Sequence, residues 1–231
     1  MRYKNIINGK FISRPNRFIA YVEIDGQEEK VHVKNTGRCK ELLIPGCNVY
    51  LAVSDNSERK TKYDLIATEK VLDDGRTILI NMDSQVPNDV AEEWLAECGM
   101  FSSSAIIKRE VTFGKSRFDF YIEDGERKVF LEVKGCTLEK DGVAMFPDAP
   151  TERGVKHINE LRECIDKGYE SYILFIIQMK DVKEFRPNDD THKEFGDALR
   201  KAYHSGVKII AMNCNVTPEG LTVSDEIFVK L

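Results

Sequence analysis

The chain has 231 residues, of which 42% are hydrophobic and 32% are charged, and its formal net charge is −5. This balance is typical of a globular protein with one large domain or two modest ones. It excludes a protein that coats nucleic acid through a general basic excess, so any contact with nucleic acid must come from a local basic surface.

Cysteine usage and the apolar runs indicate a compartment. The six cysteines are scattered and form no Cys-x-x-Cys pair, which predicts reduced thiols and neither a zinc knuckle nor a disulfide framework. The longest apolar run, residues 172–177, is too short to span a bilayer. The first residues lack the apolar core of a signal peptide. We therefore expect a cytoplasmic protein with no membrane contact.

Short strands separated by turns are predicted over the first 80 or so residues. Asp25-Gly26 is a strong signal for a two-residue hairpin turn. One helical turn is expected over residues 39–43, before Pro45-Gly46. The predicted strands are 17–24, 28–34, 48–53, 62–71 and 76–80. Such a series favours a small Greek-key barrel of the OB type, which we place in residues 1–83 as a nucleic-acid-binding domain.

A different pattern begins near Pro87-Asn88, so we place a second domain in residues 84–231. A helix is predicted over 90–97, with Asn88 or Asp89 as its N-cap. The remaining predicted elements are strands at 105–112, 117–122 and 128–134, a helix at 151–167, a strand at 171–178, a helix at 192–204 and a strand at 207–213. This alternation predicts an α/β domain with a mixed sheet covered by helices on both faces.

The segment 116–134 carries the most informative chemistry. If Asp124-Gly125 is a two-residue turn, Asp119 lies opposite Phe130. Side chains alternate along a strand, so Glu132 and Lys134 share a face, and Asp119 falls on that face roughly 7–8 Å from Glu132. The opposite face is then entirely apolar, with Phe118, Phe120, Ile122, Val129, Leu131 and Val133.

Two carboxylates beside a lysine suit phosphodiester hydrolysis. Carboxylates can hold Mg²⁺ or Mn²⁺, which accepts a phosphate oxygen as a further ligand. The lysine can orient the attacking water or offset the charge of the phosphate. The alternative is a hairpin with a solvated charged face, which is common for an isolated Glu-x-Lys.

Two further segments are candidates for nucleic-acid contact. On the helix at 151–167, Arg153, Lys156 and His157 are expected to face the scissile phosphate; the alternative is a solvated helix face with an Arg–Glu network. In the barrel, phosphate and base-stacking contacts are expected from Arg14, Arg17, Phe18, Asn35 and Thr36, against the alternative of ordinary surface residues.

Some polar residues have no single assignment. A metal site sometimes recruits a third acid, and Glu92, Glu93 and Glu110 are all candidates that are more often surface residues. Gln178 ends the predicted buried strand, where it is either a functional group or simply a polar residue at a strand end.

The set Asp119, Glu132 and Lys134 resembles the PD-(D/E)xK nuclease superfamily, although Phe118 stands where that superfamily has proline. The whole chain resembles the sugar fermentation stimulation protein A (SfsA) family. The resemblance rests on residues 14–18 (RPNRF), 35–37 (NTG), 43–46 (LIPG), 116–120 (SRFDF), 132–134 (EVK) and 146–157 (FPDAPTERGVKH). Arg38-Cys39-Lys40 departs from the family, in which a smaller residue is usual.

The resemblance implies an OB-like barrel followed by a restriction-endonuclease-like mixed-sheet domain that binds DNA. Two functions follow from it. One is a Mg²⁺- or Mn²⁺-dependent nuclease that acts on DNA or RNA, with Asp119 and Glu132 as metal ligands and with Arg117 among the nucleic-acid contacts. The other is a non-catalytic DNA-binding regulator of sugar metabolism genes. The complete set of Asp119, Glu132 and Lys134 favours the enzyme.

Overall fold

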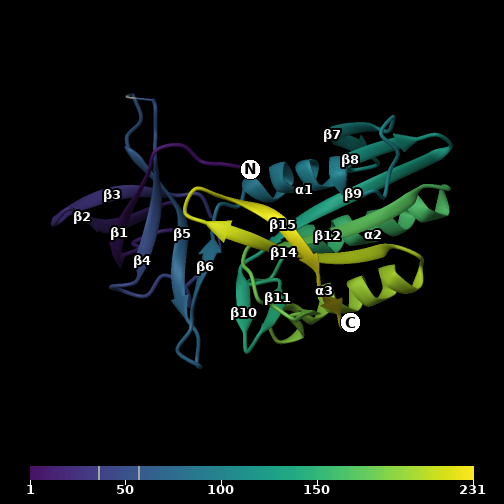
Figure 1. The fold of residues 1–231 in the computed structure, drawn as a ribbon. Coiled ribbons are helices and arrows are strands. Elements are labelled where there is room, and N and C mark those ends of the chain that lie inside the picture. The colour runs from purple at the N-terminus through teal and green to yellow at the C-terminus, as the bar shows by residue number, and fades with distance from the viewer. Residues whose placement is uncertain (36, 57) are drawn as a thin grey trace.

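The structure is a computed structural model that describes residues 1–35, 37–56 and 58–231. Figure 1 shows two units, one built from the N-terminal strands in purple and blue, and the other from the remainder of the chain in teal to yellow. Among the described residues, no helix is both long enough and apolar enough to cross a membrane.

The first unit is a closed barrel, which confirms the predicted OB type. Its sheet runs in the order β3-β2-β1-β4-β5-β6, and a parallel pairing of β3 with β5 closes the five-stranded ring. The Asp25-Gly26 turn is present as predicted, with φ values of 51° and 78°. The strands are β1 Ile6–Ser13, β2 Ile19–Ile24, β3 Gln27–Val33, β4 Asn48–Val53, β5 Tyr63–Val71 and β6 Thr77–Asn81.

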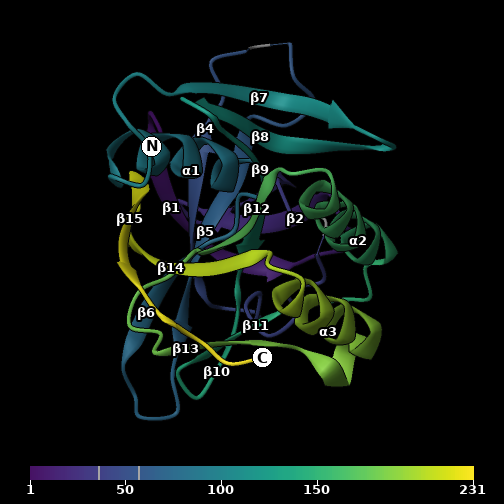
Figure 2. The same ribbon diagram turned by 90° about the vertical axis from the view of Figure 1, so that its right-hand side faces the viewer.

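The second unit is a mixed sheet covered by helices on both faces, again as predicted. Its order is β15-β14-β12-β9-β8-β7, in which β14, β12 and β9 are parallel and the outer strands are antiparallel. The elements are α1 Val86–Glu97, β7 Ile106–Phe113, β8 Ser116–Asp124, β9 Arg127–Cys136, α2 Glu152–Asp166, β12 Glu170–Ile177, α3 Asp189–His204, β14 Lys208–Thr217 and β15 Gly220–Glu226. Helix α1 packs on one face, and α2, with α3 beside it, covers the other (Figure 2).

A small third sheet was not predicted. It has the order β10-β11-β13-β16 and consists of β10 Leu138–Lys140, β11 Val143–Phe146, β13 Glu184–Pro187 and β16 Phe228–Val229. These strands have two to four residues, so they carry too little periodic pattern to be recognised in the sequence.

Helix α1 begins earlier than predicted. It starts at Val86 with Gln85 as N-cap, so the prediction of Asn88 or Asp89 as N-cap is wrong. Pro87 lies within the first turn, where its missing N–H costs no hydrogen bond. The earlier start places Asn88 inside the helix, where its side chain points at β8.

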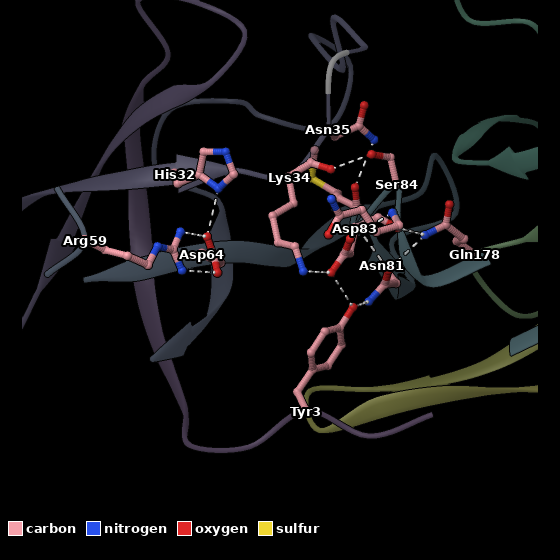
Figure 3. Close-up of polar contacts among 12 residues, drawn as sticks. Tyr3, His32, Lys34, Asn35, Arg59, Asp64, Asn81, Asp83, Ser84 and Gln178 are labelled. Carbon is pink, nitrogen blue, oxygen red and sulfur yellow. Dashed lines mark hydrogen bonds and ion pairs between the residues drawn. The ribbon is translucent and has the colours of Figure 1, made fainter. Parts of the chain in front are cut away.

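Buried hydrogen bonds join the two units (Figure 3). Gln178 follows β12, and its Nε2 donates to Asn81 Oδ1 at 2.8 Å and to the Asp83 carbonyl at 3.0 Å. The Asn81 N–H donates in return to the Gln178 carbonyl. Gly135 must be glycine because a Cβ there would lie 2.5 Å from Gln178 Oε1. Gln178 therefore fixes the connection between barrel and sheet, which answers the question that the sequence left open.

Candidate acid–lysine site

The β8–β9 hairpin brings the predicted acids together in a different register. Asp124 pairs with Arg127, so the turn is Gly125-Glu126 and the prediction of Asp119 opposite Phe130 is wrong by two residues. A shift by an even number keeps the paired side chains of residues 120–124 and 127–131 on their predicted faces, since the period of a strand is two.

Asp119 lies at a kink in the β7–β8 hairpin. Phe118 packs with Phe130 in the core beneath α2, whereas Phe120 packs in the core beneath α1, which corrects the prediction that both phenylalanines share one face. On the neighbouring strand Glu110 has φ 59°, an unusual value for a residue other than glycine. The backbone pairing of β8 with β9 ends at Phe120, and beyond it the Asp119 carboxylate accepts a hydrogen bond from the backbone of β9.

Two hydrogen bonds orient the Asp119 carboxylate. Its Oδ2 accepts from the Val133 N–H at 2.7 Å, and its Oδ1 accepts from Asn88 Nδ2 at 2.8 Å. Burial raises the pKa of Asp119, and the nearby Glu132 carboxylate raises it further. A cation placed between the two carboxylates would remove this repulsion.

Glu132 is held on one oxygen only. Both Lys134 Nζ and His157 Nδ1 donate to its Oε1, the second at 2.5 Å, while its buried Oε2 has no hydrogen-bond partner. The side chain is 4% exposed. Burial alone would raise the pKa of Glu132, but Lys134 and His157 outweigh it and lower the pKa below its usual value. The carboxylate is therefore ionised and one of its oxygens is available.

These residues fit a divalent cation that is itself well hydrated. Within the described part of the chain, no three or more Asp, Glu, His and Cys residues form a ligand cluster. Mg²⁺ needs only one or two carboxylates, since it keeps several waters and takes phosphate oxygens as ligands. A buried carboxylate oxygen without a partner is rare in a protein and fits a position that a cation fills.

The three candidate third acids have other partners. Glu92 pairs with Arg109 at 3.1 Å, Glu93 with the N-terminal ammonium, and Glu110 with Arg117 at 2.6 Å. In this structure the three carboxylates form ion pairs with arginine side chains or the N-terminal ammonium, outside the site.

The residues predicted on α2 separate into two groups. His157 is buried and bonded to Glu132, so it occupies the interior of the site in place of the predicted contact with a phosphate. Arg153 is exposed and its Nε lies 3.4 Å from His157 Nε2. Lys156 is also exposed and donates to the Lys115 carbonyl at 2.7 Å. The sequence placed His157 near the site but could not show its bond to Glu132.

The predicted barrel residues also differ in their roles. Arg17 is exposed, and Phe18 has 55% of its surface exposed. Arg14 donates to four backbone carbonyls, so its guanidinium is engaged inside the protein. Asn35 donates to the Met82 carbonyl at 2.9 Å. The prediction for Thr36 lies outside the described residues.

Fold and site together define a two-domain protein in which an OB barrel precedes a mixed-sheet domain with an acid–lysine cluster. Residues 12–80 match the family model described as the SfsA N-terminal OB domain, and residues 85–220 match the Sugar fermentation stimulation protein RE domain. The chain belongs to the sugar fermentation stimulation protein family. The division that we placed between residues 83 and 84 stays a prediction.

Relatives match along the whole chain. A Sugar fermentation stimulation protein homolog of Desulfitobacterium hafniense is 59% identical over 100% of this chain and 99% of its own length. One of Clostridium beijerinckii is 54% identical over the full length of both proteins. The structure of Pyrococcus furiosus SfsA in complex with Ca²⁺ aligns with a TM-score of 0.84 at 28% identity, covering 100% of this chain and 98% of the other.

Proposed function

We propose that this protein is a Mg²⁺- or Mn²⁺-dependent nuclease that hydrolyses phosphodiester bonds in DNA, with RNA as a second substrate to be tested. The observation that carries the proposal is the buried, unpartnered Oε2 of Glu132 beside Asp119 and Lys134. The solved relative in complex with Ca²⁺ supports a divalent cation as ligand. The free cysteines of this chain also suit the reducing cytoplasm.

Each residue of the cluster has a distinct role in this proposal. Asp119 and Glu132 hold the cation, which when bound supplies charge stabilisation to the phosphoryl oxygens and lowers the pKa of a bound water. Asn88 and the Val133 N–H orient Asp119. Lys134 lies next to Glu132, with 18% of its side chain exposed, so its ammonium can hold the attacking water or neutralise the phosphate.

His157 completes the site as a positioning residue. By occupying Oε1 together with Lys134, it leaves Oε2 as the free oxygen of Glu132. Partners that orient a ligand carboxylate in this way commonly affect metal affinity by about 10–100-fold.

A cleavage assay tests the proposal. The purified protein is incubated with linear DNA, circular DNA and single-stranded RNA, in Mg²⁺, Mn²⁺ or EDTA. Cleavage is expected in either metal and not in EDTA, and it should be lost in Asp119→Asn and Lys134→Ala. Glu123→Gln is the matched control, because this acid lies on the same strand but pairs with Lys108 at the surface.

The outcomes separate the candidate functions. Equal cleavage by the wild type and by Asp119→Asn would identify a contaminating nuclease and contradict the proposal. Binding of DNA without cleavage in any metal would instead favour the non-catalytic regulator.

A further inference from the structure

A groove of about 450 Å³ opens at the end of the barrel, where the chain leaves β1 and residues 37–45 cross the barrel end. Phe11, Leu43 and Pro45 give it apolar walls, while Arg17, Arg38 and Lys40 contribute exposed cationic side chains.

The three groove cations are available to a ligand. Across residues 1–35, 37–56 and 58–231, none of them forms an ion pair. Two acids, Glu41 and Asp148, also lie beside this loop, where they add to the effect of burial in raising the pKa of the Cys39 thiol, and Asp148 lies against Gly37. On a protein of net charge −5, this is a local basic surface of the kind that a polyanion requires.

Arg14 makes the groove a preformed structure. Its Nη1 donates to the Gly37 and Arg38 carbonyls, both at 2.9 Å, and its Nη2 donates to the Arg17 and Asn35 carbonyls at 2.7 and 2.6 Å. One guanidinium therefore ties together the two segments that carry the cations. A ligand that binds such a site does not have to order its loops first.

Phe18 directly follows the groove residue Arg17 in the chain and carries an exposed aromatic ring on a fixed backbone. Its N–H donates to Asn16 Oδ1 at 2.9 Å, and its carbonyl accepts from the Val33 N–H at 2.8 Å. With 55% of its surface exposed, the ring contributes little to the core. An exposed aromatic that directly follows an unpaired cation in the chain suits the stacking of an unpaired base whose phosphate that cation binds.

The groove is also close to the acid–lysine cluster. Asn35, on the groove loop, donates to the Met82 carbonyl, and Met82 is only six positions before Asn88, which holds Asp119. From Met82 to Asn88 the chain runs through about three extended residues and one helical turn. The groove loop and Asp119 therefore lie within about 25 Å of each other. A strand of a few nucleotides can cover this span, in keeping with the roughly 4–16 nucleotides that one OB barrel binds.

We propose that the groove binds single-stranded nucleic acid and presents it to the cluster around Glu132. This inference rests on the proposed nuclease function. A single strand is favoured over a duplex because an unpaired base is needed to stack on Phe18. The cluster is also recessed, because the side chains of Glu132 and His157 are only 4% and 6% exposed.

Binding is tested separately from cleavage by fluorescence anisotropy in EDTA. The probes are a 20-nucleotide oligo-dT, a 20-nucleotide oligo-rU and a 20-base-pair duplex. Single strands are expected to bind at least about tenfold more tightly than the duplex. Replacing Arg17, Arg38 or Lys40 with alanine should weaken single-strand binding and reduce the slope of log K against log salt by about 0.7 for each phosphate that the protein no longer neutralises.

Phe18 provides the test of stacking. Phe18→Leu should weaken binding about fivefold or more, and Phe18→Trp should restore it. Lys201→Ala removes an exposed cation near the end of α3 and serves as the control, with wild-type affinity expected.

The results distinguish this inference from the proposed function. Loss of single-strand binding in the groove variants supports the groove even if no cleavage is ever found. Wild-type affinity and salt slope in all groove variants would overturn it, even for an active nuclease. Equal affinity for the duplex would overturn the choice of a single strand, and the two oligonucleotides decide between DNA and RNA.

Discussion

Asp83 and Glu132 are two buried carboxylates that each pair with a lysine, yet their surroundings differ. Asp83 is fully satisfied: Oδ1 accepts from the Gln85 N–H at 3.0 Å, and Oδ2 accepts from Lys34 at 2.6 Å and Tyr3 at 3.4 Å (Figure 3). Glu132 has both of its partners on Oε1 and none on Oε2.

The difference teaches how to separate a structural pair from a functional one. Burying a charge is costly unless all its hydrogen-bonding capacity is used, so a complete set of partners indicates a role in stability. A buried carboxylate oxygen that lacks a partner and lies near a second carboxylate is a position where a cation can supply the remaining partner. We therefore expect changes at Asp83 to affect folding and changes at Glu132 to affect chemistry.

The largest difference in cleavage rate is expected between alanine variants of the two lysines. Lys134→Ala should reduce the rate of metal-dependent cleavage by about 10²–10⁴-fold, the range for loss of a group that acts on the attacking water. Lys34→Ala should leave the rate per folded molecule within about threefold of wild type, because the Lys34 ammonium bonds to Asp83 and, among the described residues, to no group of the acid–lysine cluster. Single-turnover rates on one DNA substrate measure both. Equal losses would remove the distinction between the pairs.

The second effect is on stability. Asp83→Asn should lower the free energy of unfolding by about 3 kcal/mol, because it breaks a buried pair and leaves Lys34 without its partner. Glu132→Gln should cost less, about 1 kcal/mol, because the amide oxygen can keep both donors of Oε1 while the NH2 group replaces Oε2, which has no partner to lose. Urea denaturation followed by fluorescence of Trp94 measures both. A larger loss for Glu132→Gln would show that Glu132 is mainly structural.

Ligand binding sharpens the same comparison. Ca²⁺ at 100 times its Kd should raise the free energy of unfolding of the wild type by about 2.7 kcal/mol. Asp83→Asn should show the same increase with Ca²⁺, although its free energy of unfolding without Ca²⁺ is lower. Glu132→Gln should show no increase. Denaturation with Ca²⁺ and with EDTA gives the difference. An increment preserved in Glu132→Gln would place the cation elsewhere.

The smallest effect is expected from a surface pair. Hydrogen bonds from Arg127 lower the pKa of Glu170 to about 2, from a usual 4.5. A lowered pKa stabilises the fold above pH 4.5, and this contribution is lost as the pH falls toward 2. With a third of the side chain exposed, the pair contributes about 1 kcal/mol. Glu170→Gln should be less stable than wild type at pH 7 and equal to it near pH 2. A difference that is independent of pH would contradict this account.

Local signals in the sequence predicted much of the fold. The Asp25-Gly26 turn, the strand at 48–53 and the two-sided helical cover all follow from turn chemistry and apolar periodicity. Strand β1 was not predicted individually, because Asn8-Gly9-Lys10 interrupts its apolar pattern and it depends on pairing with β2 and β4. The start of α1 was misplaced because a proline usually marks a helix boundary.

The site was predictable in composition but not in geometry. Asp119, Glu132 and Lys134 share a hairpin, so the alternation of a strand is enough to group them. The kink beside Glu110 and the bonds from Asn88 and His157 depend on tertiary packing, which no local pattern encodes. Nor could the sequence show that Arg14 is engaged by backbone carbonyls.

The central claim is that Asp119 and Glu132 form one cation site. Anomalous scattering from a crystal soaked in Mn²⁺ tests it most directly. The account predicts a peak roughly 2.0–2.3 Å from Oε2 of Glu132 and from an oxygen of Asp119. No peak at these residues, in a crystal that binds Mn²⁺ elsewhere, would contradict it.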